Sequence, residues 1–242
     1  MQFQAAADDD SNFAPAQRGL GLSAARAGNF TEATRYFETA LKLDPRSSLT
    51  HRDYARVLAQ ADRHAEACTH FRAALLINPT DANLNYELAL SFQAINHDDE
   101  AESCYATAAR LNPAFTEAHY NLGVLLMNRN QVNEATNRFR SAVASRPDFA
   151  PAYFGLGIAA AQSNQLTEAI GWYKKALSFS PDNAEIHNAL GYALSQNGNP
   201  TEAQQHWEQA LRLDPTIAGL TEALANARRE IMLNAPTSRS TP

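Results

Sequence analysis

Six prolines recur along the chain at a constant interval of 34 residues, and this interval constrains the fold more than any other feature. They are Pro45, Pro79, Pro113, Pro147, Pro181 and Pro215. Proline lacks the amide hydrogen that a helix interior needs and disfavours helical geometry in the residue before it, so each proline ends one structural unit. A long fixed period is the signature of a repeat protein, whose units bury their apolar faces only against their neighbours.

Other residues recur in the same register when the units begin at residues 14, 48, 82, 116, 150 and 184. Alanine stands twelve and five residues before each proline: Ala33, Ala67, Ala101, Ala135, Ala169 and Ala203, then Ala40, Ala74, Ala108, Ala142, Ala176 and Ala210. An aromatic residue stands eight before it: Phe37, Phe71, Tyr105, Phe139, Tyr173 and Trp207. These intervals place alanine, aromatic and alanine on one helical face, which we expect to be buried between helices.

Two further columns divide each unit into two helices. A residue that tolerates left-handed geometry lies midway, at Gly28, Asp62, Asn96, Asn130, Asn164 and Gly198. A glutamate follows four residues later, at Glu32, Glu66, Glu100, Glu134, Glu168 and Glu202. Because a carboxylate is favoured near the positive end of a helix, this column marks the start of the second helix. Each unit is therefore predicted to be a helix, a tight turn, a second helix and a proline stop.

This set of columns, together with pairs such as Leu122-Gly123 and Leu156-Gly157 near the front of each unit, resembles the tetratricopeptide repeat family. The resemblance covers residues 14–217 as six repeats, namely 14–47, 48–81, 82–115, 116–149, 150–183 and 184–217. It implies an all-α, right-handed superhelical solenoid of antiparallel helix pairs. The tryptophan that the family carries at its fourth position is replaced here by Gln17, His51, Asn85, His119, Tyr153 and His187.

Both ends of the chain lie outside the six repeats. Extending the register backwards aligns residues 1–13 with the end of a further repeat, and we expect a truncated repeat or an N-terminal cap helix, with an acidic disordered arm as the alternative. At the other end, residues 218–235 are rich in Ala, Leu, Glu and Arg and are predicted to form a C-terminal capping helix. The polar residues 236–242 are expected to be a disordered tail.

Composition excludes several classes of function. The net charge of −6 argues against general attraction to nucleic acid, and no apolar run is long enough to span a bilayer. Two cysteines, Cys68 and Cys104, cannot make a disulfide framework and fit a reducing, cytoplasmic setting. No nucleophile, base and orienting acid fall into a catalytic arrangement, so we expect neither an enzyme nor a cofactor. His64 and Cys68 lie one helical turn apart without a clear third ligand, so no metal site is predicted.

In the tetratricopeptide repeat family the first helices line a concave groove for a peptide or a helix of a partner, and the resemblance implies which side chains face it. The fifth position of each unit gives Arg18, Arg52, Tyr86, Tyr120, Phe154 and Asn188. The ninth gives Leu22, Arg56, Leu90, Val124, Ile158 and Tyr192, and the twelfth and thirteenth add Arg26, Met127 and Asn128. The arginines cluster towards the N-terminal end, and the aromatic and aliphatic residues follow.

We therefore expect a non-enzymatic protein-interaction scaffold that grips an unidentified partner, with an acidic part near the arginines and an apolar part on the aromatic row. The arginines could equally be solvated or paired with neighbouring acids. An alternative is that the chain is the recognition arm of a longer multidomain protein, such as a protein glycosyltransferase-like enzyme or an assembly factor. The sequence does not determine the oligomeric state.

Overall fold

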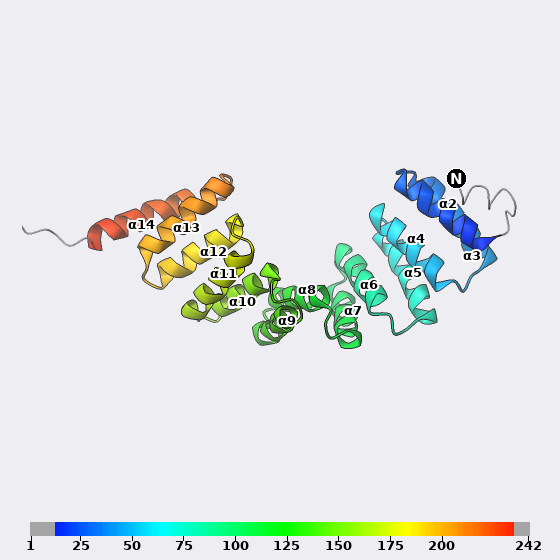
Figure 1. The fold of residues 1–242 in the computed structure, drawn as a ribbon, viewed down its shortest axis with the longest axis horizontal. Helices are drawn as coiled ribbons and strands as arrows, with labels where there is room; N and C mark the ends of the chain where they lie inside the picture. Colours follow the sequence, from blue (N-terminus) through cyan, green and yellow to red (C-terminus); the bar gives the residue numbers. More distant parts are fainter. Residues whose placement is uncertain (1–12, 235–242) are drawn as a thin grey trace, which may run out of the picture. The chain divides into compact units, whose positions relative to one another are not determined.

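The computed structural model describes residues 13–234, and these form thirteen α-helices and no β-strand (Figure 1). The first helices of the six pairs are α2 (Ala14–Arg26), α4 (Ser48–Gln60), α6 (Ala82–Ala94), α8 (Thr116–Asn128), α10 (Ala150–Gln162) and α12 (Ala184–Gln196). The second helices are α3 (Phe30–Leu43), α5 (His64–Ile77), α7 (Asp98–Leu111), α9 (Val132–Ser145), α11 (Leu166–Phe179) and α13 (Pro200–Leu213). A single helix, α14 (Leu220–Asn234), follows the last pair. The predicted all-α helical repeat solenoid is confirmed.

Each first helix begins at the residue where the proline register starts a repeat. The final helix differs from the prediction because it starts at Leu220 rather than at residue 218. Gly219 adopts a φ of +75°, a left-handed conformation that cannot lie within a right-handed helix. The expected cap helix in residues 1–13 and the tail 236–242 lie outside the described residues, except for Phe13, which precedes α2.

The turn within each pair has the predicted left-handed residue. All six have positive φ: Gly28 (79°), Asp62 (60°), Asn96 (59°), Asn130 (61°), Asn164 (58°) and Gly198 (78°). In the first turn the amide of Asn29 donates to the carbonyl of Ala24 at 2.9 Å, and the amide of Gly28 donates to that of Ala25 at 3.0 Å. These bonds satisfy carbonyls that the end of α2 would otherwise leave unpaired. The chain therefore reverses within a few residues, and the second helix packs antiparallel to the first.

The predicted packing columns form the core. All twelve column alanines are 0% exposed, and the six aromatic residues are between 0% and 3% exposed. The small residue that follows the apolar residue near the front of a repeat accommodates the aromatic ring. A Cβ atom added to Gly157 would lie 2.3 Å from Cε1 of Tyr173, and one added to Gly191 would lie 2.4 Å from Nε1 of Trp207. Glycine therefore lets the ring of the second helix approach the backbone of the first in these two repeats, whereas the second and third repeats have the buried alanines Ala55 and Ala89 in the same column.

The chain divides into two compact units, residues 1–118 and 119–242, which we describe separately. The described part of the N-terminal unit contains α2 to α7 and the first residues of α8. There Ala108, Ala109 and Ala118 form a buried cluster against Tyr86 and Phe115. The C-terminal unit contains the remainder of α8 and continues to α14, whose Leu220, Leu224 and Ala227 are buried. No helix within residues 13–234 has the length and apolar character needed to cross a bilayer.

The glutamate column lies in the first turn of the second helices, as predicted, and it has a second role in the C-terminal unit. Glu168 accepts an ion pair from Arg140 of the preceding repeat at 3.8 Å, and Glu202 accepts one from Lys174 at 2.7 Å. Both pairs link successive second helices across the surface. Such exposed pairs contribute at most about 1 kcal/mol each, so burial of the columns remains the main source of stability.

Candidate functional site: the face of the first helices

The ninth residue of each repeat lies on the solvent-exposed face of a first helix, which we call the first-helix face. Three of these side chains are large, apolar and exposed, namely Leu90 (41%), Ile158 (39%) and Tyr192 (41%). Arg56 is also exposed, and Leu22 and Val124 are half-buried. Leu90 belongs to the N-terminal unit, whereas Ile158 and Tyr192 belong to the C-terminal unit. Each unit therefore presents apolar surface at a position that the repeat packing does not bury.

The fifth-position aromatic residues, expected to form the apolar part of the groove, pack against other rings within their own unit. Tyr86 packs against Phe115 with ring centroids 4.8 Å apart, and Tyr120 lies 5.4 Å from Phe149. Both tyrosines, like Phe154, also contact the buried aromatic residue of their own repeat at 5.6–5.9 Å. All three side chains are half-buried, and burial raises the pKa of Tyr120. They offer an edge to a ligand, but they also belong to the packing between helices.

The arginines at the N-terminal end are mostly paired within the chain. Arg18 donates to Asp53 at 2.9 Å, and Arg52 donates to the other oxygen of the same carboxylate at 3.3 Å. Asp53 is only 6% exposed, so it needs these cationic partners. Arg56 grips Glu87 of the next repeat through Nε and Nη2, and this hydrogen bonding raises the pKa of its guanidinium. The alternative of pairing with neighbouring acids is therefore realised for these three arginines.

Arg26 is the exception, since it makes no ion pair with any described residue and its side chain is exposed. It lies in the last turn of α2 and lines a hollow between α2 and α4 of about 280 Å³. The hollow is lined by Leu22, Ala25, Arg26, Asp53, Arg56, Val57 and Gln60. The structure thus brings together three of the predicted site residues, Leu22, Arg26 and Arg56, in one concavity of the N-terminal unit.

The remaining predicted residues lie on α8 and α12 of the C-terminal unit. Met127 is half-buried and Asn128 is exposed. Asn188 is half-buried, and its side-chain oxygen is buried without a hydrogen-bond partner. A buried polar atom without a partner costs about 1–3 kcal/mol of stability, and a hydrogen bond from a donor would remove this cost. Its own backbone carbonyl is occupied, since it accepts the indole Nε1–H of Trp207 at 3.2 Å.

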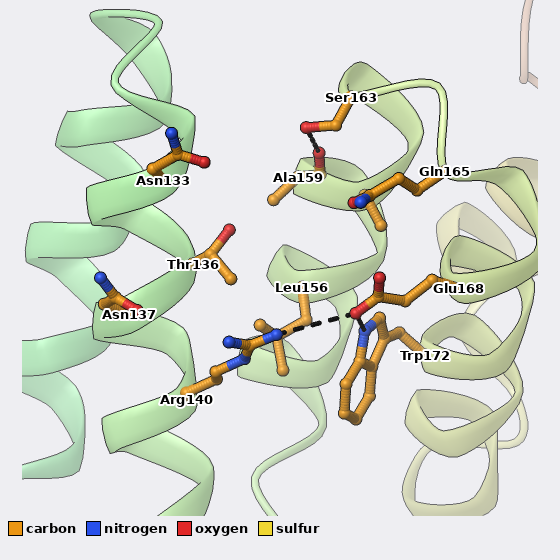
Figure 2. A pocket seen from close by; sticks show the side chains of 11 residues that line it. Asn133, Thr136, Asn137, Arg140, Leu156, Ala159, Ser163, Gln165, Glu168 and Trp172 are labelled. Atoms are coloured by element: carbon orange, nitrogen blue, oxygen red, sulfur yellow. Dashed lines mark hydrogen bonds and ion pairs between the residues drawn. The ribbon is translucent and has the colours of Figure 1, made fainter.

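A second hollow, of about 250 Å³, was not anticipated from the sequence (Figure 2). It is lined by the second helices α9 and α11 and by the first helix α10, and no ninth-position residue is among its lining residues. Asn133, Asn137 and Arg140 approach it from one side and Glu168 and Trp172 from the other, as Figure 2 shows. Trp172 Nε1–H donates to Glu168 at 3.1 Å. Asn133 and Asn137 each stand two residues before a packing-column residue, and this pattern does not indicate a cavity in the sequence. The hollow arises because two second helices are spaced apart.

Two of the three fourth-position histidines, His51 and His187, each contact a histidine of the second helix of the same repeat. His51 Nε2 lies 3.2 Å from the carbonyl oxygen of Pro45, and a carbonyl can only accept, so this nitrogen carries the hydrogen. The Nδ1 atoms of His51 and His70 lie 3.0 Å apart, within hydrogen-bond distance. Burial and the neighbouring His51 lower the pKa of His70 to about 4. The same contacts recur between His187, His206 and Pro181.

The described residues contain no group of three or more His, Cys, Asp or Glu side chains placed to hold a metal ion. Cys68 is buried, and burial raises the pKa of its thiol, which disfavours the thiolate that a metal or a nucleophilic reaction would need. Burial likewise raises the pKa of Cys104 to about 11. The first-helix face and its hollow are therefore the features that carry the functional argument.

Comparison with known families gives matches along the chain. A model described as tetratricopeptide repeat matches residues 2–82 and 86–135, a second described as TPR repeat matches 159–198, and a third described as tetratricopeptide repeat matches 184–217. No curated protein sequence matches the chain significantly.

Many solved structures share the fold. The C-terminal part of a TPR repeat-containing protein from Cytophaga hutchinsonii is 17% identical, with 92% of each chain covered and a TM-score of 0.76. PilF of Pseudomonas aeruginosa is 18% identical, with 90% of this chain and 97% of PilF covered and a TM-score of 0.70. YrrB, a TPR protein described as having an unusual peptide-binding site, is 19% identical, with 80% of this chain and 97% of YrrB covered and a TM-score of 0.66. At these identities the likeness establishes the fold alone.

Proposed function

Because the chain belongs to the tetratricopeptide repeat family, we propose that it is a non-enzymatic protein-interaction scaffold that binds a peptide or a helix of a partner on its first-helix face. The observation that carries the proposal is the exposure of Leu90, Ile158 and Tyr192 at the same position of three repeats. Binding through this face is the same whether the scaffold acts alone or as the recognition arm of a longer protein.

The physical argument concerns what these side chains contribute to the fold. The repeat buries its alanines and its aromatic column almost completely, whereas Leu90, Ile158 and Tyr192 at the ninth position remain about two-fifths exposed. Burial of apolar surface is worth about 25 cal/mol per Å², and this gain is still available to a partner that covers them. Tyr192 adds an aromatic ring, a residue type enriched in the centres of protein interfaces.

The half-buried aromatic residues are the fifth-position residues of the first helices α6, α8 and α10. Tyr86, Tyr120 and Phe154 are held by core rings, so their orientation is fixed before a ligand arrives. Side chains that are already ordered lose little conformational entropy on binding. The proposal therefore assigns the ninth-position row to direct contact and the fifth-position row to shaping the surface.

A capture experiment with a matched control tests the proposal. The row variant carries Leu90→Asp, Ile158→Asp and Tyr192→Asp, which place charge on exposed positions; of these, Tyr192 also packs edge-to-face on Trp207, with ring centroids 5.1 Å apart. The control carries Leu76→Asp, Ile77→Asp and Phe179→Asp, three exposed apolar residues of the second helices α5 and α11. Circular dichroism first establishes that both variants keep the helical content of the wild type.

We expect affinity capture followed by mass spectrometry to recover a protein with the wild type and with the control but not with the row variant. Equal recovery by the row variant and the wild type would show that the partner does not bind the first-helix face. Loss with the control alone would move the binding surface to the second helices and contradict the proposal.

A further inference from the structure

The hollow between α2 and α4 concentrates positive charge in a chain whose net charge is −6. Four guanidinium groups lie in or beside it, and the carboxylates that they contact are those of Asp53 and Glu87. The contacting groups therefore leave an excess of positive charge. Such a local excess attracts an anionic ligand even when the molecule as a whole is negative.

Some of the arginine N–H donors at the hollow have no acceptor within the described part of the chain. Arg18 and Arg52 are both engaged with Asp53. Arg56 uses Nε and Nη2 on Glu87, and its Nη1 has no hydrogen-bond partner among residues 13–234. Arg26 has its whole fork of donors available, since no described residue pairs with it. Arg26 and the Nη1 atom of Arg56 therefore line the same hollow with unused donors.

The other walls of the hollow are apolar except for Gln60. Leu22 and Ala25 come from α2, and Val57 comes from α4. A carboxylate can accept two parallel hydrogen bonds from a guanidinium, and an aliphatic neighbour can pack against leucine and valine. The hollow of about 280 Å³ therefore combines guanidinium donors that can bind a carboxylate with an apolar wall.

We infer that this hollow binds an acidic side chain of the partner segment, with its carboxylate on Arg26 and on Nη1 of Arg56 and an adjacent apolar side chain against Leu22 and Val57. The inference rests on the proposed function and adds the chemistry of the ligand. Repulsion from Glu87 and Asp53 opposes the approach of a second carboxylate. Because both are already neutralised by arginines and Arg26 is not, attraction to Arg26 outweighs that repulsion.

The test is selection of peptides by the complete chain from a random dodecapeptide library displayed on phage. A selected peptide is then synthesised in two forms, one with its Asp and Glu residues and one with Asn and Gln in their place. Isothermal titration compares both forms against the wild type, Arg26→Gln and the control Arg35→Gln. Arg35 is an exposed arginine of the second helix α3, so its removal lowers the net charge equally without touching the hollow.

We expect the selected peptides to be enriched in Asp and Glu. We also expect the wild type and Arg35→Gln to bind the acidic form about tenfold or more tightly than the amide form, in line with a charge-assisted hydrogen bond, and Arg26→Gln to lose this preference. Selected peptides without acidic enrichment, or a preference that Arg26→Gln leaves intact, would overturn the inference and leave the proposed function standing. Failure to select any peptide would overturn both the inference and the proposed function. Selected peptides that bind the row variant as tightly as the wild type would also overturn both.

Discussion

Phe139 provides a stringent test of how the repeats pack. Its side chain is 1% exposed and lies between two glycines of the first helices α8 and α10. A Cβ atom at Gly123 would lie 2.6 Å from Cε1 of the ring, and one at Gly155 would lie 2.7 Å from Cζ. The ring therefore occupies the space that alanine side chains would need at both positions, and the effect of a methyl group there depends on whether the ring is present.

The expected free energies follow from this geometry. Phe139→Ala removes a fully buried ring and should cost about 3–5 kcal/mol. Gly123→Ala in the wild type gains about 1 kcal/mol of helix propensity but overpacks the ring at a cost of about 1–3 kcal/mol, a net loss of up to about 2 kcal/mol. In the Phe139→Ala background the same methyl group enters the vacated space. It then keeps the propensity gain and adds about 0.8 kcal/mol of burial, so it should stabilise by nearly 2 kcal/mol.

Urea denaturation followed by circular dichroism measures all four proteins of this double-mutant cycle. The account predicts that Gly123→Ala changes sign, from destabilising in the wild type to stabilising beside Phe139→Ala. The Gly155→Ala cycle should behave in the same way. The packing of these glycines on the ring would be refuted if Gly123→Ala had an effect of the same sign and size in both backgrounds. It would also be refuted if Phe139→Ala were as stable as the wild type.

Two further predictions concern the histidine pairs and the turns. Because the pKa of His70 is about 4 in the folded chain and near 6.5 when unfolded, the unfolded state binds more protons, so stability should be full above about pH 6.5 and fall as the pH approaches 4. Denaturation midpoints between pH 7.5 and 4.5 should fall less steeply for His70→Phe, and an unchanged slope would contradict the assignment. Gly28→Ala should cost about 1–2 kcal/mol because of its φ of 79°, whereas Gly171→Ala, in open space on α11, should stabilise by about 1 kcal/mol. Equal thermal shifts for these two variants would show that backbone conformation does not govern them.

The fold could be predicted because its determinants are local and repeated. The left-handed residue at Asn130, the proline stop at Pro147 and the alanine at Ala142 each specify a backbone or packing requirement without reference to distant residues. Six copies of each then fix the register. The start of α14 was less predictable, because only the geometry of Gly219 determines where the helix resumes.

The candidate site was only partly predictable, because its contacts join different repeats. The partners of Arg18 and Arg56 lie 35 and 31 residues away, close to one period, so pairing each fifth or ninth position with the next repeat would have suggested Asp53 and Glu87. Tyr120 packs against Phe149, the last residue of the repeat, and Phe149 lies outside the recurring columns. Of the four arginines predicted to line the groove, Arg26 is the one without an ion pair among residues 13–234, and identifying it required the side-chain positions themselves.

Site-specific photocrosslinking inside the cell tests the central claim that the first-helix face is the binding surface. A photoreactive phenylalanine analogue is placed singly at Leu90, Ile158 or Tyr192, and for comparison at Leu76 or Phe179 on the second helices. All five side chains are exposed. Tyr192 and Phe179 also contact the buried rings of Trp207 and Tyr153, and an aromatic analogue keeps a ring at these two positions. The account predicts a crosslinked partner from the first three positions and none from the other two. Crosslinks confined to Leu76 and Phe179 would contradict it.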